Sequence, residues 1–217
     1  KMFLYILAGL AAIIIVFFCY MDFHRPIIVE KTRLPRRHVL YQQHQLDKKD
    51  LNKTFFALGT DIRGVFDHCL RFGIFYDDPN QLVDRNQARS AIGVYIDESE
   101  VAKAKEFAAT HQNYRVGTLP EIDAVRTTFA YKNVLSFIWV MLRVLPGLKK
   151  HLIKKNLVTD LEEETFGIIG NYHWKNPKNR FSEYIIPYGK NVKVDNCLTT
   201  DPAPQLKPQC QTKKTKQ

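Results

Sequence analysis

The sequence contains two stretches that begin in the same way, "FGIFYDDPN" (72–80) and "FGIIGNYHWKNPKN" (166–179). Each opens with Phe-Gly-Ile, continues with apolar residues and ends in a polar turn around a proline, Pro79 or Pro177. An apolar run that stops at Asp, Asn and Pro is typical of a β-strand entering a turn. The two stretches therefore predict the same strand and turn in two copies of one structural unit.

The residues around the first stretch predict the rest of that unit. A strand is expected at 37–45, and a helix at 51–70 carries apolar residues at spacings of three and four. The strand that begins at Phe72 follows, and then an antiparallel strand at 89–97. Residues 37–97 thus predict the order strand, helix, strand, strand.

The same order is predicted around the second stretch, across residues 122–188. Its elements are a strand at 122–132, a helix from Asn133, and strands at 164–174 and 180–188. Pro146 interrupts the helix, so a kink or a fresh start is expected there. A further helix at 98–112 and a short strand at 114–120 connect the two units.

Two such units predict an α+β fold. One unit buries only a single face of its helix, but two units side by side form a continuous curved antiparallel sheet with both helices on one face. The opposite, concave face then forms a groove at the pseudo-twofold axis, and this groove is the natural place for a ligand.

The first residues predict a membrane anchor. From Met2 to Met21 the sequence carries no charge, and about 20 apolar residues suffice for a helix to cross the hydrocarbon core. The domain boundaries that follow are a transmembrane helix at 2–21, a basic linker at 22–36, the duplicated domain at 37–190 and an irregular tail rich in Pro and Lys at 191–217.

The charge around this anchor predicts that the domain faces the cytosol. Five basic residues follow the apolar run within a short distance, Arg25, Lys31, Arg33, Arg36 and Arg37, whereas only Lys1 precedes it. Positive charge close to a transmembrane helix favours the cytosolic side.

Composition narrows the classes of partner and cofactor. The net charge of +10 favours anionic partners such as lipid head groups. The alternative is that the basic residues form an ordinary solvated surface. Nucleic acid is a weaker expectation because no recognised binding module appears. Four scattered cysteines and seven histidines without HxH or HExxH spacing predict no metal site and no cofactor.

Several stretches, taken in order, resemble a known family. "FGIFYDDPNQLVDRNQARSAIGVYI" (72–96), "VRTTFAYKNVLSFIWVMLRVLPGLKKHLIKKNL" (125–157) and "FSEYIIP" (181–187) resemble the testis-expressed protein 264 family, whose members carry a membrane-anchored GyrI-like domain. With the anchor, the resemblance covers most of residues 1–190. It implies a GyrI-like fold preceded by a single transmembrane helix.

The resemblance also implies a location and a role. Such a protein is a single-pass protein of the endoplasmic reticulum membrane with its domain in the cytosol, where it acts as an adaptor and as a receptor for selective autophagy of the reticulum (ER-phagy). Another organelle membrane is the alternative location. Two other function classes stay open: a structural accessory subunit of a larger membrane complex, and a GyrI-like hydrolase, which the lack of an identifiable nucleophile disfavours.

The resemblance further implies a ligand-binding carboxylate, because Glu183 matches an acidic position at the base of the GyrI-like groove. A carboxylate among aromatic rings attracts small apolar or cationic ligands. The aromatic residues expected to share this pocket are Tyr95, Tyr131, Trp139, Tyr172 and Tyr184. The alternative is that these rings fill the core and that Glu183 lies on the surface.

A basic run follows Pro146 along the predicted helix and includes Lys149, Lys150, Lys154 and Lys155. It forms either a solvated face or a surface that contacts anionic lipid head groups, each contact being worth about 1 kcal/mol.

Overall fold

The computed structural model of the chain describes residues 2–20, 26–45, 48–77, 89–133, 135–159, 167–173, 180–189 and 198–200. The predictions for residues 22–25 of the linker, for the start of the strand at 164–166 and for most of the tail at 191–217 lie outside these ranges. The strands are β1 (Glu30–Leu34), β2 (Arg37–Gln45), β3 (Arg71–Phe75), β4 (Arg89–Ile96), β5 (Arg115–Leu119), β6 (Ile122–Ala130), β7 (Ile168–His173), β8 (Phe181–Pro187) and β9 (Thr199–Thr200).

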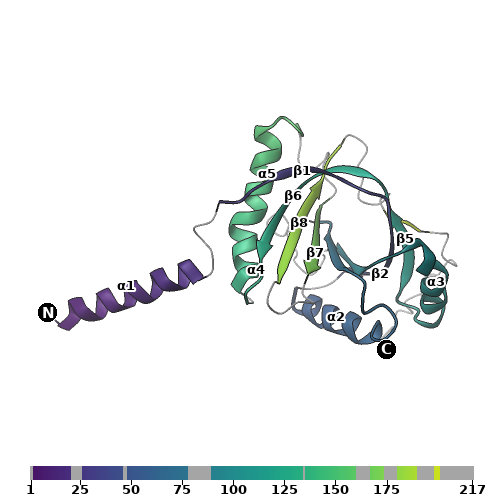
Figure 1. Cartoon of the computed structure of the whole chain (residues 1–217), viewed down its shortest axis with the longest axis horizontal. Coiled ribbons are helices and arrows are strands. Elements are labelled where there is room, and N and C mark those ends of the chain that lie inside the picture. Colours follow the sequence, from purple (N-terminus) through teal and green to yellow (C-terminus); the bar gives the residue numbers. More distant parts are fainter. Residues whose placement is uncertain are drawn as a thin grey trace, which may run out of the picture.

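These strands form one antiparallel sheet in the order β1-β6-β8-β7-β3-β4-β2-β5-β9. The sheet is curled, and helices cover its outer face (Figure 1). They are α2 (Lys48–Asp61), α3 (Val101–Thr110), α4 (Leu135–Trp139) and α5 (Leu145–Lys154), with the single turns η2 (Glu98–Glu100) and η3 (Val140–Val144). The predicted α+β class with a curved antiparallel sheet is confirmed.

Both predicted units contain their elements in the predicted order. The first is β2-α2-β3-β4, and the second is β6, the helical segment from α4 to α5, β7 and β8. Read outward from the centre of the sheet, the second unit has the order β7-β8-β6 and the first unit has the equivalent order β3-β4-β2. The units therefore meet where β3 pairs with β7, and Gly73 lies opposite Gly170.

Both copies of Phe-Gly-Ile lie at this junction, but they are not equivalent in the sheet, because Gly73 of the first copy pairs with Gly170 and not with Gly167 of the second. Strand β7 begins at Ile168, and Gly167 just before it has a left-handed φ of 102°. A Cβ at Gly167 would lie 2.4 Å from the carbonyl oxygen of Phe75. Glycine is required here because the backbone of the two strands approaches closely.

Strand β1 was not predicted, since it lies inside the stretch interpreted as a basic linker. It pairs with β6, and Leu34 lies opposite Ile122. On the other side β5 pairs with β2, and Leu119 lies opposite Arg37. The second unit is thus extended by the edge strand β1, and the first by β5 and the two-residue edge strand β9.

The helix predicted at 51–70 is shorter than its apolar pattern indicates. α2 ends at Asp61, and the chain then forms turns in which Gly64 has a φ of 75° and its N–H donates to the Asp67 carboxylate. Ile62 and Phe66 are fully buried in these turns. The apolar spacing therefore predicted the buried residues correctly, whereas the helix end was wrong because a left-handed glycine terminates the helix.

The predicted break near Pro146 is confirmed: the helix changes there from a π-helical turn to an α-helix. The π-helical turn η3 separates α4 from α5, and Pro146 lies in the first turn of α5. Proline has no N–H to donate and cannot sit in a regular helix interior, so the wider turn accommodates it.

Helix α1 (Met2–Tyr20) extends away from the sheet, on the side of α4 (Figure 1). The ring of Phe18 packs edge-on against Trp139 at 6.5 Å, and the Lys132 ammonium donates to the carbonyl of Tyr20. No helix within the described ranges is long and apolar enough to cross a membrane. The structure contains a helix at the predicted position, Met2–Tyr20, and the membrane crossing stays a prediction.

Candidate ligand-binding pocket

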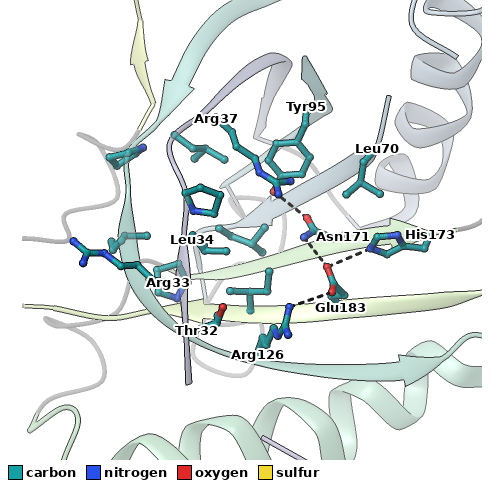
Figure 2. Close-up of a pocket in the computed structure, with 17 residues that line it drawn as sticks. Thr32, Arg33, Leu34, Arg37, Leu70, Tyr95, Arg126, Asn171, His173 and Glu183 are labelled. Carbon is teal, nitrogen blue, oxygen red and sulfur yellow. Dashed lines mark hydrogen bonds and ion pairs between the residues drawn. The ribbon is translucent and has the colours of Figure 1, made fainter. Parts of the chain in front are cut away.

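The inner face of the curled sheet contains a pocket of about 360 Å³ (Figure 2). Strands from both units and the edge strand β1 contribute to it. Its walls are Thr32, Arg33, Leu34, Pro35, Arg37, Leu70, Tyr95, Leu119, Pro120, Ile122, Arg126, Ile169, Asn171, His173, Glu183, Ile185 and Pro187. The pocket combines aliphatic and proline walls with a small group of polar side chains, as small-molecule sites do.

Hydrogen bonds connect the polar side chains of the pocket into one chain. The Tyr95 hydroxyl donates to Oδ1 of Asn171 at 2.9 Å, and Nδ2 of Asn171 donates to the Glu183 carboxylate at 3.2 Å. Nε2 of His173 lies 3.2 Å from the same carboxylate oxygen. Burial raises the pKa of Tyr95, so its hydroxyl stays protonated and acts as the donor at the head of the chain.

The Glu183 carboxylate therefore has several hydrogen-bonding and charged neighbours. Its side chain is 18% exposed, and besides Asn171 and His173 it has a guanidinium nitrogen of Arg126 at 3.9 Å. A buried carboxylate is stable only when donors and a nearby cation offset the loss of water. The negative charge of Glu183 is thus largely offset by the residues around it.

Three arginines make the lining positive overall. Arg33 also contacts Glu121 at 2.7 Å, and Arg126 also contacts Glu30 at 3.3 Å. The Arg37 guanidinium lies 5.0 Å from the centre of the Tyr95 ring, a cation–π contact. In the part of the chain that the structure describes, no carboxylate pairs with Arg37.

Two of the predicted ligand-binding residues line the pocket, Glu183 and Tyr95. Four do not: Tyr131, Trp139, Tyr172 and Tyr184. Alternation along a strand explains two of these errors, because neighbours on a strand point to opposite faces of the sheet. Tyr172 follows Asn171, and Tyr184 follows Glu183, so both rings point to the outer face.

On that outer face these rings belong to the core beneath the helices. The Tyr172 ring packs edge-on against Phe55 of α2 at 5.2 Å. Tyr184 is buried in a cluster with Leu148 of α5. Trp139 lies on α4, where it contacts α1. The alternative reading, that aromatic residues fill the core, is therefore right for Tyr172 and Tyr184.

Sequence reasoning missed most of the polar residues that surround Glu183. Asn171 and His173 lie on β7, and Asn171 is paired with Glu183 across the ladder. Arg126 reaches the carboxylate from β6. Alternation places Asn171 and His173 on one face of their strand, but the residue opposite them depends on the register of the hairpin, which the sequence does not specify.

The predicted basic surface lies on and just after α5. Lys150, Lys154 and Lys155 are exposed, and Lys149 is half-buried. Their contact with lipid head groups stays a prediction.

No known protein-family profile matches the chain. No curated protein matches it in sequence either. Among solved structures it is similar to the C-terminal domain of EcmrR, at 12% identity over 76% of this chain and 99% of that chain, with a TM-score of 0.48. A hydrolase from Listeria innocua matches at 11% identity over 74% and 91% of the two chains, with a TM-score of 0.47.

A third similar structure is SAV2435 bound to tetraphenylphosphonium, at 9% identity over 75% of this chain and 94% of that chain, with a TM-score of 0.45. We take neither a family nor a function from these similarities, because each TM-score is below 0.5.

The polar side chains of the pocket offer both charges and hydrogen-bonding groups to a ligand (Figure 2). The Tyr95 hydroxyl is held protonated, and the Glu183 carboxylate is held by its neighbours. These groups can position a ligand by charge and hydrogen bonds.

Proposed function

We propose that the chain is a GyrI-like ligand-binding domain whose inner pocket binds a small organic anion with an apolar body. The observation that supports this choice is the charge of the lining, in which three arginines face a single carboxylate. Because Asn171, His173 and Arg126 already surround Glu183, that carboxylate has little capacity left for a cationic ligand. Arg37 is the cation best placed to bind an anionic group.

The remaining walls suit the apolar part of such a ligand. Leu34 comes from β1 and Leu119 from β5, and Ile122, Ile169 and Ile185 complete an aliphatic surface. Burying this surface against a hydrocarbon or aromatic body contributes about 25 cal/mol per Å². The charge of the arginines then orients the bound ligand and makes the site prefer anions.

Calorimetric titration of the full chain in mild detergent tests the proposal, with titrations into detergent alone subtracted. The probes are 8-anilinonaphthalene-1-sulfonate, the neutral N-phenyl-1-naphthylamine, and the cation tetraphenylphosphonium. We expect the sulfonate to bind most tightly. Arg37→Gln should weaken it roughly tenfold, the value of a charge-assisted hydrogen bond of about 1.5 kcal/mol.

The matched control is Arg36→Gln, because Arg36 is an exposed neighbour that does not line the pocket. Its affinity for the sulfonate should equal that of the wild type. Tighter binding of tetraphenylphosphonium, lost in Glu183→Gln, would replace the anion proposal with the cationic ligand that the sequence predicts. Absence of binding by all three probes would overturn a ligand-binding role for this pocket.

We also propose that α1 holds the domain at a membrane by insertion into lipid. The helix carries no charged residue, and its described side chains are exposed to solvent. Leu135, Ile138 and Leu142, on the neighbouring α4 and η3, are exposed as well, at 39%, 55% and 68%. A large contiguous apolar surface of this kind is typical of a membrane or protein contact.

Flotation with phosphatidylcholine vesicles tests the membrane proposal. The full chain should float with the vesicles, and a variant with Ile13→Asp and Val16→Asp should stay at the bottom of the gradient. A wild-type chain that stays at the bottom would refute it. The reticulum location, the adaptor role, the autophagy-receptor role and the accessory-subunit alternative stay predictions from the sequence, as does the absence of hydrolase activity.

A further inference from the structure

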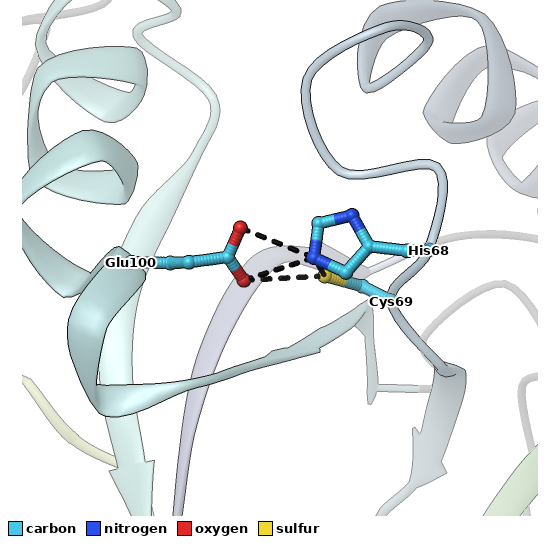
Figure 3. A group of neighbouring side chains, drawn as sticks. All are labelled: His68, Cys69 and Glu100. Carbon is cyan, nitrogen blue, oxygen red and sulfur yellow. Dashed lines mark hydrogen bonds and ion pairs between the residues drawn. The ribbon is translucent and has the colours of Figure 1, made fainter.

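Three side chains with metal-binding atoms meet on the outer side of the first unit (Figure 3). His68 and Cys69 lie in the turns that follow α2, and Glu100 lies in η2 at the start of α3. Glu100 is 32 residues from His68 and 31 from Cys69 in the sequence, whereas His68 and Cys69 are adjacent. None of them lines the pocket described above, so this site is independent of the proposed function.

The distances between the three ligand atoms suit a tetrahedral ion. Nε2 of His68 lies 3.1 Å from a carboxylate oxygen of Glu100, and Sγ of Cys69 lies 3.6 Å from Nε2 and 3.8 Å from Oε2. With Zn–S near 2.3 Å and Zn–N and Zn–O near 2.1 Å, a tetrahedral angle places N and O about 3.4 Å apart and S about 3.6 Å from each. Each observed separation is within about 0.3 Å of that triangle.

The backbone holds these ligands in place. The N–H of Cys69 donates to the carbonyl of Phe66, and the N–H of Glu100 donates to the carbonyl of Asp97. Leu70, next to Cys69, accepts from the N–H of Tyr95 and so attaches the turn to the end of β4. A metal ion would meet ligands that are already positioned, which reduces the entropy lost on binding.

Burial differs among the three and leaves one side open. Cys69 is buried, with 7% of its surface exposed, whereas the Glu100 side chain is 18% exposed and the His68 side chain is 61% exposed. The ammonium of Lys103, three residues after Glu100, donates to the carbonyl of Val65 at 2.9 Å. Three protein ligands with a solvent-facing fourth position are typical of a zinc site that keeps a bound water.

We propose that His68, Cys69 and Glu100 bind a Zn²⁺ ion with water as the fourth ligand. Binding replaces the thiol proton of Cys69, which is released to solvent, and uses the unprotonated Nε2 of His68. The ion would join the turn after α2 to the start of α3. Zinc should therefore stabilise the folded chain as well as bind to it.

Cobalt titration of the full, metal-free chain in mild detergent tests the site. Co²⁺ is the spectroscopic probe because a thiolate ligand produces a sulfur-to-cobalt charge-transfer band in the near ultraviolet. We expect this band to saturate at one equivalent and to disappear when Zn²⁺ is added. The melting temperature, followed by circular dichroism, should rise with Zn²⁺.

His68→Gln is the decisive variant, because an exposed side chain can be replaced without disturbing the core. It should weaken cobalt binding by at least tenfold, and Cys69→Ser should abolish the charge-transfer band. The matched controls are His111→Gln, a histidine outside the cluster, and Cys19→Ser, a cysteine on α1; both should bind as the wild type does.

Two results would overturn the proposal. One is the absence of the band at a roughly tenfold excess of Co²⁺, which would leave the three side chains as a hydrogen-bonded group. The other is a band of unchanged strength and affinity in both His68→Gln and Cys69→Ser, which would place the metal on other residues.

Discussion

Gly93 is the position where the packing of the sheet allows no side chain. It lies on β4 opposite Tyr41 of β2. A Cβ at this position would lie 2.2 Å from the carbonyl oxygen of Leu40 and 2.8 Å from both Cα and Cβ of Tyr41. Two of these three atoms belong to the backbone of a paired strand and cannot rotate away.

Gly93→Ala must therefore separate β2 from β4 in the middle of the first unit. Overpacking of a close-packed interior costs about 1–3 kcal/mol, and a clash with backbone atoms belongs at the upper end of that range. A loss of about 3 kcal/mol corresponds to a melting temperature lower by roughly 6–12 °C for a domain of this size. Urea and thermal unfolding of the full chain in mild detergent, followed by circular dichroism, measure both quantities.

Gly147→Ala on α5 is the matched control. A Cβ there would have the Cδ1 atom of Ile27 as its nearest neighbour, at an ordinary contact distance of 3.4 Å. Alanine in a helix restricts the unfolded chain, so this variant should be more stable by about 0.4–1 kcal/mol. If Gly93→Ala unfolds within about 1 kcal/mol of the wild type, within the usual cost of a conservative core substitution, the register between β2 and β4 is wrong.

Three further predictions concern the buried tyrosines and the orientation of the chain. Tyr95→Phe removes the donor to the Asn171 carbonyl and should lower the free energy of unfolding by about 1–2 kcal/mol in urea titrations, whereas an unchanged value would show that the hydrogen bond is not formed. Burial raises the pKa of Tyr95, Tyr172 and Tyr184, so the unfolded chain loses these protons near pH 10 while the folded chain keeps them. The contribution of these tyrosines to the free energy of unfolding is complete below pH 10 and should fall above it by about 1.4 kcal/mol per pH unit for each tyrosine. Urea unfolding midpoints between about pH 8 and 11 measure this fall. Midpoints that do not change with pH would contradict the burial of the three hydroxyls. The Asn52-Lys53-Thr54 acceptor should carry no glycan in a secretory-competent cell, and a mobility shift that glycosidase and Asn52→Gln both remove would place the domain in the lumen.

The order of the secondary structure elements follows from local patterns in the sequence. β2 and β6 lie within the strands predicted at 37–45 and 122–132, and the helix predicted at 98–112 contains α3. Pro146 predicted the break between α4 and α5, because a residue without an N–H acts on its own helix wherever it lies. These features depend on neighbours within a few positions and need no knowledge of the fold.

Element ends were less predictable where a distant residue decides them. Strand β1 lies in a short basic segment with two prolines nearby, and it becomes a strand because β6 offers an unpaired edge. Gly167 of the second Phe-Gly-Ile lies just before β7, since its backbone passes close to Phe75. Both outcomes depend on contacts between units that are far apart in the chain.

The two candidate sites show the same division between sequence and tertiary structure. The sequence by itself determined that two strand–helix–strand–strand units would form a curved antiparallel sheet, and the family resemblance singled out Glu183 for its inner face. Only the register of β7 and β8 decided that Asn171 and His173 face Glu183 while Tyr172 and Tyr184 turn to the helices, because a shift of one residue exchanges the two faces of a strand. Likewise, no spacing in the sequence links His68 and Cys69 to Glu100; the sheet brings the end of the α2 turns beside η2, and three side chains without a motif become neighbours.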